Sequence, residues 1–285
     1  MTITSAVGFW DLLSALENAQ TPELVRALKP FAQLTANCYE CGVEVPTLPH
    51  KHGKTADINV AGLFLKRSLN DLRAIWNLLA MGYTSQAGAV AASAFENALV
   101  VTCVAGNLDR SNKLLKSESV ELPWSVADMC KMHIQQLNEN RKSSKAYSEK
   151  GFEDSWTALY AHYVWLCMVK HPTVQSAVHD AFSIKIDEHQ YGIMAAPDTR
   201  PEDLPNKAMV LVVTINRIVN TIDDFAKAYG VDNKDPRVVS WQRRLDSIFL
   251  DIDKAMEPLW HTQPPIGIGS SRFARQYQKK RRRIS

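Results

Sequence analysis

Residues 65–101 read LKRSLNDLRAIWNLLAMGYTSQAGAVAASAFENALVV, and this stretch decides the fold of the 285-residue chain. Its first part repeats apolar side chains at helical spacing. They are Leu65, Leu69, Leu72, Trp76 and Leu79, while Lys66, Asn70, Arg73 and Asn77 hold the opposite face. This pattern predicts an amphipathic helix with one buried and one exposed side.

A second helix is predicted at about 85–105, after a turn from Gly82 to Ser85. It is apolar nearly all round, which is typical of a central helix. Its small residues Ala87, Ala91, Ala94 and Ala98 would let a neighbouring backbone approach closely. The two helices predict a long antiparallel hairpin at about 58–106, and the fold class is an all-α helical bundle built around it.

Further helices follow from the same periodicity. Stripes of apolar residues run through 152–166, 211–229 and 241–259, and no alternating run predicts a strand. Ser125 and Asp128 resemble a capping box, and Gly230 stands at a C-cap position. Thr21 and Pro22 are interpreted as the start of a helix. The stretch 183–207, with three prolines, is predicted to be a loop.

Three regions are expected along the chain: an N-terminal helical segment at 1–54, a helical-bundle core at 55–260, and a flexible basic tail at 261–285. The chain begins without the features of a signal peptide and has no wholly apolar run of 18 residues. We therefore expect a cytoplasmic protein without a membrane span. Its five cysteines are expected to be reduced thiols.

The net charge of +3 is unevenly placed. The tail carries +7 and no acid from residue 272 onward, so the rest of the chain carries −4. Clustered Lys and Arg attract phosphate backbones without sequence preference. The residues predicted to contact nucleic acid are Arg272, Arg275, Lys279, Lys280, Arg281, Arg282 and Arg283. The alternative is a solvated tail that aids solubility or targeting.

Glu96 is the only formally charged side chain between Arg73 and Asp109. A carboxylate inside an apolar helix is costly unless it is paired or hydrogen-bonded. It is therefore a candidate active-site acid, or else a structural carboxylate held by an Arg or Lys of a neighbouring helix.

Tyr163, Lys170 and His171 form a second candidate group. Tyr163 and Lys170 fall on one helical face, and His171 precedes a proline, where a helix ends or kinks. A histidine at such a break can act as a general acid or base. The alternative is that His171 caps the next helix.

Cys38, Cys41, His50 and His52 combine residue types that bind zinc. The His-x-His spacing does not match the usual zinc pattern, and the two cysteines also fit as neighbours on a helix. No phosphate-binding glycine loop, nucleophile elbow or HExxH motif is present. We expect neither a metal nor another cofactor.

The segment 65–101, the turn Leu78-Leu79-Ala80-Met81-Gly82, Glu96, and the run from Tyr163 to His171 together resemble the bacterial DUF5677 family, within the HEPN-like all-α superfamily. The resemblance covers roughly residues 55–230. It implies a homodimeric, metal-independent ribonuclease in antiphage defence or a toxin–antitoxin pair. Glu96, Tyr163, Lys170 and His171 would form the site: His171 would activate a ribose hydroxyl and Lys170 would steady the phosphate.

The sequence departs from the superfamily's ribonuclease motif, which is Arg, four to six residues, then His. None of the eight histidines has an arginine at that distance upstream, and the Arg expected before Glu96 is replaced by Ala92 or Ser93. Two functions are therefore predicted as alternatives. One is an RNA-directed effector with a variant site. The other is a non-enzymatic interaction protein that binds a partner protein, or nucleic acid through its tail.

Overall fold

The computed structural model describes residues 6–51, 53, 55–117, 121–139, 146–170, 177 and 197–259. Within these ranges the chain is all-α, as predicted, and the one extended contact is an isolated bridge between His50 and Val231. The helices are α1 (Ala6–Ala27), α2 (Lys29–Glu44), α3 (Ala56–Ala80), α4 (Thr84–Val104), α5 (Leu108–Leu115), α6 (Val126–Glu139), α7 (Glu149–Lys170), α9 (Leu204–Tyr229) and α10 (Pro236–Met256).

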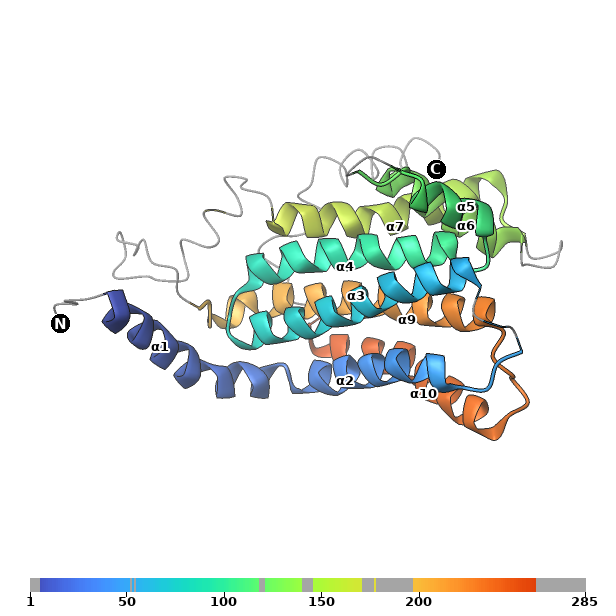
Figure 1. The fold of residues 1–285 in the computed structure, drawn as a ribbon. Helices are drawn as coiled ribbons and strands as arrows, with labels where there is room; N and C mark the ends of the chain where they lie inside the picture. The colour runs from blue at the N-terminus through green and yellow to red at the C-terminus, as the bar shows by residue number, and fades with distance from the viewer. Residues whose placement is uncertain are drawn as a thin grey trace.

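α3 and α4 are consecutive helices that pack along each other (Figure 1). Three residues join them. Gly82 in this turn has φ +90°, a backbone conformation that residues other than glycine rarely adopt. At the other end, the Gly106 amide donates a 2.9 Å hydrogen bond to the buried carboxylate of Asp57. The pair is thus fixed at both ends.

α4 lies at the centre of the bundle, with α3 and α9 on one side and α6 and α7 on the other (Figure 1). Its alanine stripe is fully buried. At Gly88 a Cβ would lie only 2.5 Å from Cγ1 of Val169, so α7 approaches α4 as closely as the missing side chain allows. α4 is also the one described helix long and apolar enough to cross a membrane, but 78% of its most apolar window is buried inside the bundle.

α2 and α10 form the layer beneath α3 and α9 (Figure 1). Phe31, Leu34 and Cys38 of α2 belong to the same hydrophobic core as the central helices. Trp241 of α10 is fully buried, and its Nε1 donates a 3.0 Å hydrogen bond to the backbone oxygen of Cys41. α2 is therefore part of the packed bundle.

The predicted caps are present. The Asp128 amide donates to Oγ of Ser125 at 3.1 Å, and the Ser125 hydroxyl donates to the Asp128 carboxylate at 2.7 Å. Gly230 ends α9 in the left-handed conformation, with φ 70°. The predicted loop at 183–207 is wrong at its C-terminal end, because Pro201–Asp203 form a short 3-10 helix and α9 begins at Leu204. Residues 183–196 of the predicted loop lie outside the described residues.

The predicted helix start at Thr21 and Pro22 is wrong. α1 begins at Ala6 and contains Pro22 in its interior. The Thr21 hydroxyl donates a 2.8 Å hydrogen bond to the Glu17 oxygen, one turn back. A proline signal marks a helix start only if nothing helical precedes it, and here residues 6–20 are helical. The real break comes at Leu28, two residues before Pro30.

Candidate functional site

Two of the four predicted catalytic residues lie together. Tyr163 of α7 donates a 2.6 Å hydrogen bond to Oε1 of Glu96 on α4. Burial and the neighbouring carboxylate raise the pKa of Tyr163 well above its usual range, so the phenol is protonated and acts as the donor. Within the described ranges, the partner of Glu96 is this hydroxyl rather than an Arg or Lys.

The other two predicted catalytic residues are not joined to this pair. Lys170 is the last residue of α7 and lies about 10 Å along that helix from Tyr163, at about 1.5 Å per residue. Neither an ion pair nor a hydrogen bond links Lys170 to Glu96 in the described part of the chain. His171 and all seven predicted tail residues, 272–283, lie outside the described residues.

The described residues considered as zinc ligands make other contacts or are buried. The His50 ring stacks on Tyr229 with centroids 4.0 Å apart, and its Nδ1 lies 3.0 Å from the Leu48 oxygen. Cys38 is fully buried, and burial raises the pKa of its thiol. Among the described residues, which exclude His52, no three His, Cys, Asp or Glu side chains are grouped to hold a metal ion.

A long groove runs between α2 and α3. It consists of two neighbouring hollows of 410 and 430 Å³ that share Tyr39, and we call it the α2–α3 groove. Small residues open it, because a Cβ added at Gly62 would meet only the Phe225 ring, at 4.0 Å. Ala32 and Val43, toward its two ends, are eleven residues apart on α2, which makes the groove roughly 16 Å long at about 1.5 Å per residue.

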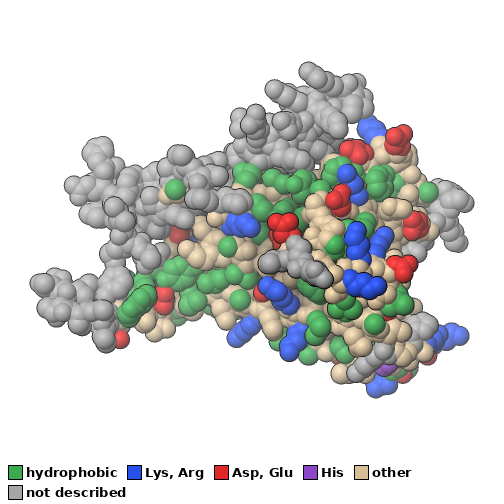
Figure 2. Space-filling view, turned by 45° about the horizontal axis from the view of Figure 1, so that its top comes forward, with side chains coloured by type: hydrophobic (Ala, Val, Ile, Leu, Met, Phe, Trp, Pro, Cys, Tyr) green, Lys and Arg blue, Asp and Glu red, His purple; other side chains and the backbone are tan. Residues whose placement is uncertain are grey.

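The charges of the α2–α3 groove are mostly positive. Lys66 and Arg73 line it from α3, and neither makes an ion pair with the described residues. Asn70 lies between them on the same face, and Glu40 of α2 is the one acid among the lining residues. Figure 2 shows Lys and Arg side chains, with Asp and Glu side chains among them, beside apolar ones on the visible face. The groove can therefore attract an anionic ligand.

Aromatic rings line the same groove. Tyr39 and Trp76 are partly buried against the core, with their remaining surface in the groove, and Phe225 forms part of its floor. Trp76 lies one helical turn from Arg73, so a ring and a cation are presented side by side. Rings next to cations can hold planar bases and their phosphates.

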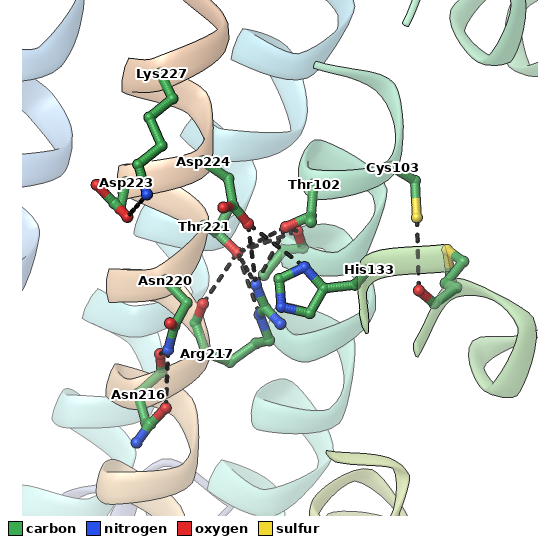
Figure 3. Close-up of polar contacts among 12 residues, drawn as sticks. Thr102, Cys103, His133, Asn216, Arg217, Asn220, Thr221, Asp223, Asp224 and Lys227 are labelled. Carbon is green, nitrogen blue, oxygen red and sulfur yellow. Dashed lines mark hydrogen bonds and ion pairs between the residues drawn. The ribbon is translucent and has the colours of Figure 1, made fainter. Parts of the chain in front are cut away.

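A second polar constellation is buried between α4, α6 and α9 (Figure 3). Arg217 of α9 is 3% exposed, and its guanidinium donates at 3.1 Å to the hydroxyls of Thr102 and Thr221. The closest carboxylate oxygen, Oδ2 of Asp224, is 3.8 Å from Nη2. His133 of α6 places Nδ1 3.6 Å from the same oxygen.

Burial dominates the proton chemistry of this constellation. Together with the positive charge of Arg217, it lowers the pKa of His133 to about 2. Burial also raises the pKa of Asp224. A histidine that stays neutral down to pH 2 is a poor general base or acid near neutrality, because efficient proton transfer needs a pKa close to the working pH. The constellation is suited to holding a charge rather than to moving a proton.

Neither the α2–α3 groove nor the buried constellation was identified as a site from the sequence. The sequence places Lys66, Asn70 and Arg73 on the exposed face of a helix. It does not predict that α2 lies beside that face. Arg217 and His133 are 84 residues apart on different helices, so no local motif joins them.

No family model, no curated protein and no solved structure matches this chain. The resemblance to the DUF5677 and HEPN-like proteins therefore remains a prediction.

Proposed function

We propose that this chain binds single-stranded RNA along the α2–α3 groove. The observation that carries the proposal is that cations without an ion pair to the described residues lie beside aromatic rings in one groove: Lys66 and Arg73 beside Tyr39 and Trp76. It agrees with the RNA-directed role that the sequence resemblance implies, while its support comes from these side chains.

The chemistry of the groove suits a single strand better than a duplex. Lys and Arg neutralise phosphates without regard to sequence. Base stacking on aromatic side chains requires unpaired bases, since a duplex hides their faces. A groove of roughly 16 Å spans only a few nucleotides of a single strand. A protein partner would instead need an acidic, apolar segment to match the same surface.

The proposal is one of binding. Cleavage by Glu96, Tyr163, Lys170 and His171, a homodimeric state, and a role in antiphage defence or a toxin–antitoxin pair remain predictions. So does the alternative of a non-enzymatic protein that engages nucleic acid or a partner through the basic tail at 261–285.

The test is the affinity of the full chain for a fluorescent single-stranded RNA of about ten nucleotides. The double variant Lys66→Ala/Arg73→Ala should bind roughly tenfold more weakly at about 0.15 M salt. The reason is that each phosphate contact adds about 0.7 to the slope of the logarithm of the association constant against the logarithm of the salt concentration. The matched control is Lys150→Ala/Lys234→Ala, which removes two exposed cations outside the groove and should change the affinity less than twofold.

Two further arms sharpen the test. Glu40→Gln removes the one acid lining the groove and should tighten binding, whereas general damage to the fold would weaken it. A duplex of the same length should bind more weakly than the single strand. Equal losses in the groove variant and in its control would contradict the proposal, and preferential capture of an acidic peptide by the same groove would favour the protein-binding alternative.

A further inference from the structure

A small pocket of 100 Å³ opens onto the buried constellation of Arg217 and lies apart from the α2–α3 groove. It is formed by α4, α6, α7 and α9, and no acidic side chain is among the described residues that line it. Its lining residues are Phe95, His133, Ile134, Leu159, His162, Val213, Asn216, Arg217 and Asn220.

The positive charge of Arg217 is incompletely balanced. Nε of the guanidinium donates to the neutral hydroxyl of Thr221, and Nη2 donates to the hydroxyls of both Thr102 and Thr221. Asp224 lies 3.8 Å from Nη2 and makes no hydrogen bond to it, and Oδ2 of Asp224 is buried without a hydrogen-bond partner in the described part of the chain. A buried cation without a hydrogen-bonded carboxylate is costly, so the site is more stable with an anion beside it.

One donor atom of Arg217 indicates where that anion would lie. Nη1 of Arg217 donates no hydrogen bond within the described ranges, and it is not among the polar atoms sealed from solvent without a partner. Asn216 and Asn220 line the same pocket from α9. The Asn220 amide donates 2.7 and 3.0 Å hydrogen bonds to the backbone and side-chain oxygens of Asn216, and it would exchange these for an anion. Nδ1 of His133 is buried, lies 3.6 Å from Oδ2 of Asp224 and has no hydrogen-bond partner among the described residues.

We infer that this pocket is a binding site for a small tetrahedral oxyanion of the phosphate class. The guanidinium of Arg217 is the charged anchor, and the amides of Asn216 and Asn220 are the neutral donors. The pocket is large enough for one such group and too small for a nucleoside. The anion can therefore be free phosphate, or the terminal phosphate of a larger molecule whose other parts stay outside the pocket.

The experiment measures the melting temperature of the full chain against inorganic phosphate and sulfate, with potassium chloride at equal ionic strength as the salt control. At about five times the dissociation constant, a specific anion should raise the melting temperature by roughly 2–4 °C. A 5′-phosphorylated dinucleotide that gives the same rise at lower concentration identifies the terminal phosphate as the source. A response to free phosphate alone identifies the free ion.

The decisive variant is Asn220→Asp, which places a carboxylate beside Arg217. It should raise the melting temperature without phosphate and abolish the phosphate-dependent rise, a combination that misfolding cannot produce. Asn59→Asp, an exposed change on α3, should keep the rise. No rise beyond that of potassium chloride, an undiminished rise in Asn220→Asp, or a lower melting temperature in that variant would each overturn the inference. Lys66→Ala/Arg73→Ala should retain the rise, so this site and the RNA groove can fail separately.

Discussion

Tyr163 and Glu96 tie α7 to the central helix α4 through a 2.6 Å hydrogen bond. The contact joins residues 67 positions apart in the chain. It places a protonated phenol against the one carboxylate of an otherwise apolar helix, so it has a structural role whether or not catalysis also uses it.

Removal of the Tyr163 hydroxyl should destabilise the fold. Tyr163→Phe leaves a half-buried carboxylate without its donor, and the expected loss in the free energy of unfolding is about 1–3 kcal/mol. Glu96→Gln keeps an acceptor oxygen for the hydroxyl and should cost less. Urea unfolding of both variants measures the difference, and a larger loss in Glu96→Gln than in Tyr163→Phe would contradict this reading of the contact.

The buried ion pair of Asp203 and Lys207 gives a second prediction. Both side chains are fully buried, and Asp203 also accepts hydrogen bonds from Thr84 and, at 3.0 Å, from Asn206. Lys207→Met should lower the free energy of unfolding by about 3–5 kcal/mol, because it removes the positive charge that contacts a fully buried carboxylate. Asp203→Asn in the same chain should recover part of the loss. Chemical denaturation checks this, and a double variant less stable than Lys207→Met would count against it.

Two glycines within helices should respond oppositely to alanine. At Gly62 the new Cβ meets only Phe225 at 4.0 Å, so the gain in helix propensity should stabilise the chain by about 0.5–1 kcal/mol. At Gly88 it would lie 2.5 Å from Val169, and overpacking should cost about 1–3 kcal/mol. Thermal melting of Gly62→Ala and Gly88→Ala measures both changes in stability. Equal effects at both sites would contradict the close approach of α7 to α4.

His133 should make the fold sensitive to mild acid. Its pKa is about 2 in the folded state and about 6.5 in an unfolded chain, so the unfolded state binds more protons between these values. Stability therefore falls as the pH drops below about 7, by roughly 2 kcal/mol between pH 7 and pH 5 from this residue. Asp224, whose pKa is raised by burial, acts in the opposite direction at lower pH.

The measurement is urea unfolding of the native chain and of His133→Asn at pH 7 and pH 5. The variant should lose less stability over this interval, because asparagine takes up no proton. Identical losses in the two proteins would show that His133 is protonated in the folded state.

The fold was predictable where local chemistry decides it. The apolar stripe from Leu65 to Leu79 specifies α3, and the polar interruption near Gly82 specifies the turn. Ser125, Asp128 and Gly230 mark helix ends because their side chain or φ angle satisfies the terminal backbone groups. Pro22 gave a wrong prediction of a helix start, because α1 tolerates a residue without a backbone N–H in its interior.

The candidate sites were less predictable because they depend on which helices are neighbours. No local motif joins Tyr163 and Glu96. The resemblance alone predicts them in one site, and the packing of α7 on α4 brings them together. Lys66 and Arg73 form a groove only because α2 lies beside α3. No Arg-to-His spacing in the sequence joins Arg217 and His133, since they lie on two helices, α9 and α6, that each pack on α4.

The salt dependence of RNA binding tests the central claim most directly. For a single strand, the logarithm of the association constant falls with the logarithm of salt by about 0.7 per phosphate contact. Removal of Lys66 and Arg73 should therefore flatten the slope by about 1.4, while Lys150→Ala/Lys234→Ala leaves it unchanged. The same slope in the groove variant as in the native chain would contradict RNA binding in the α2–α3 groove.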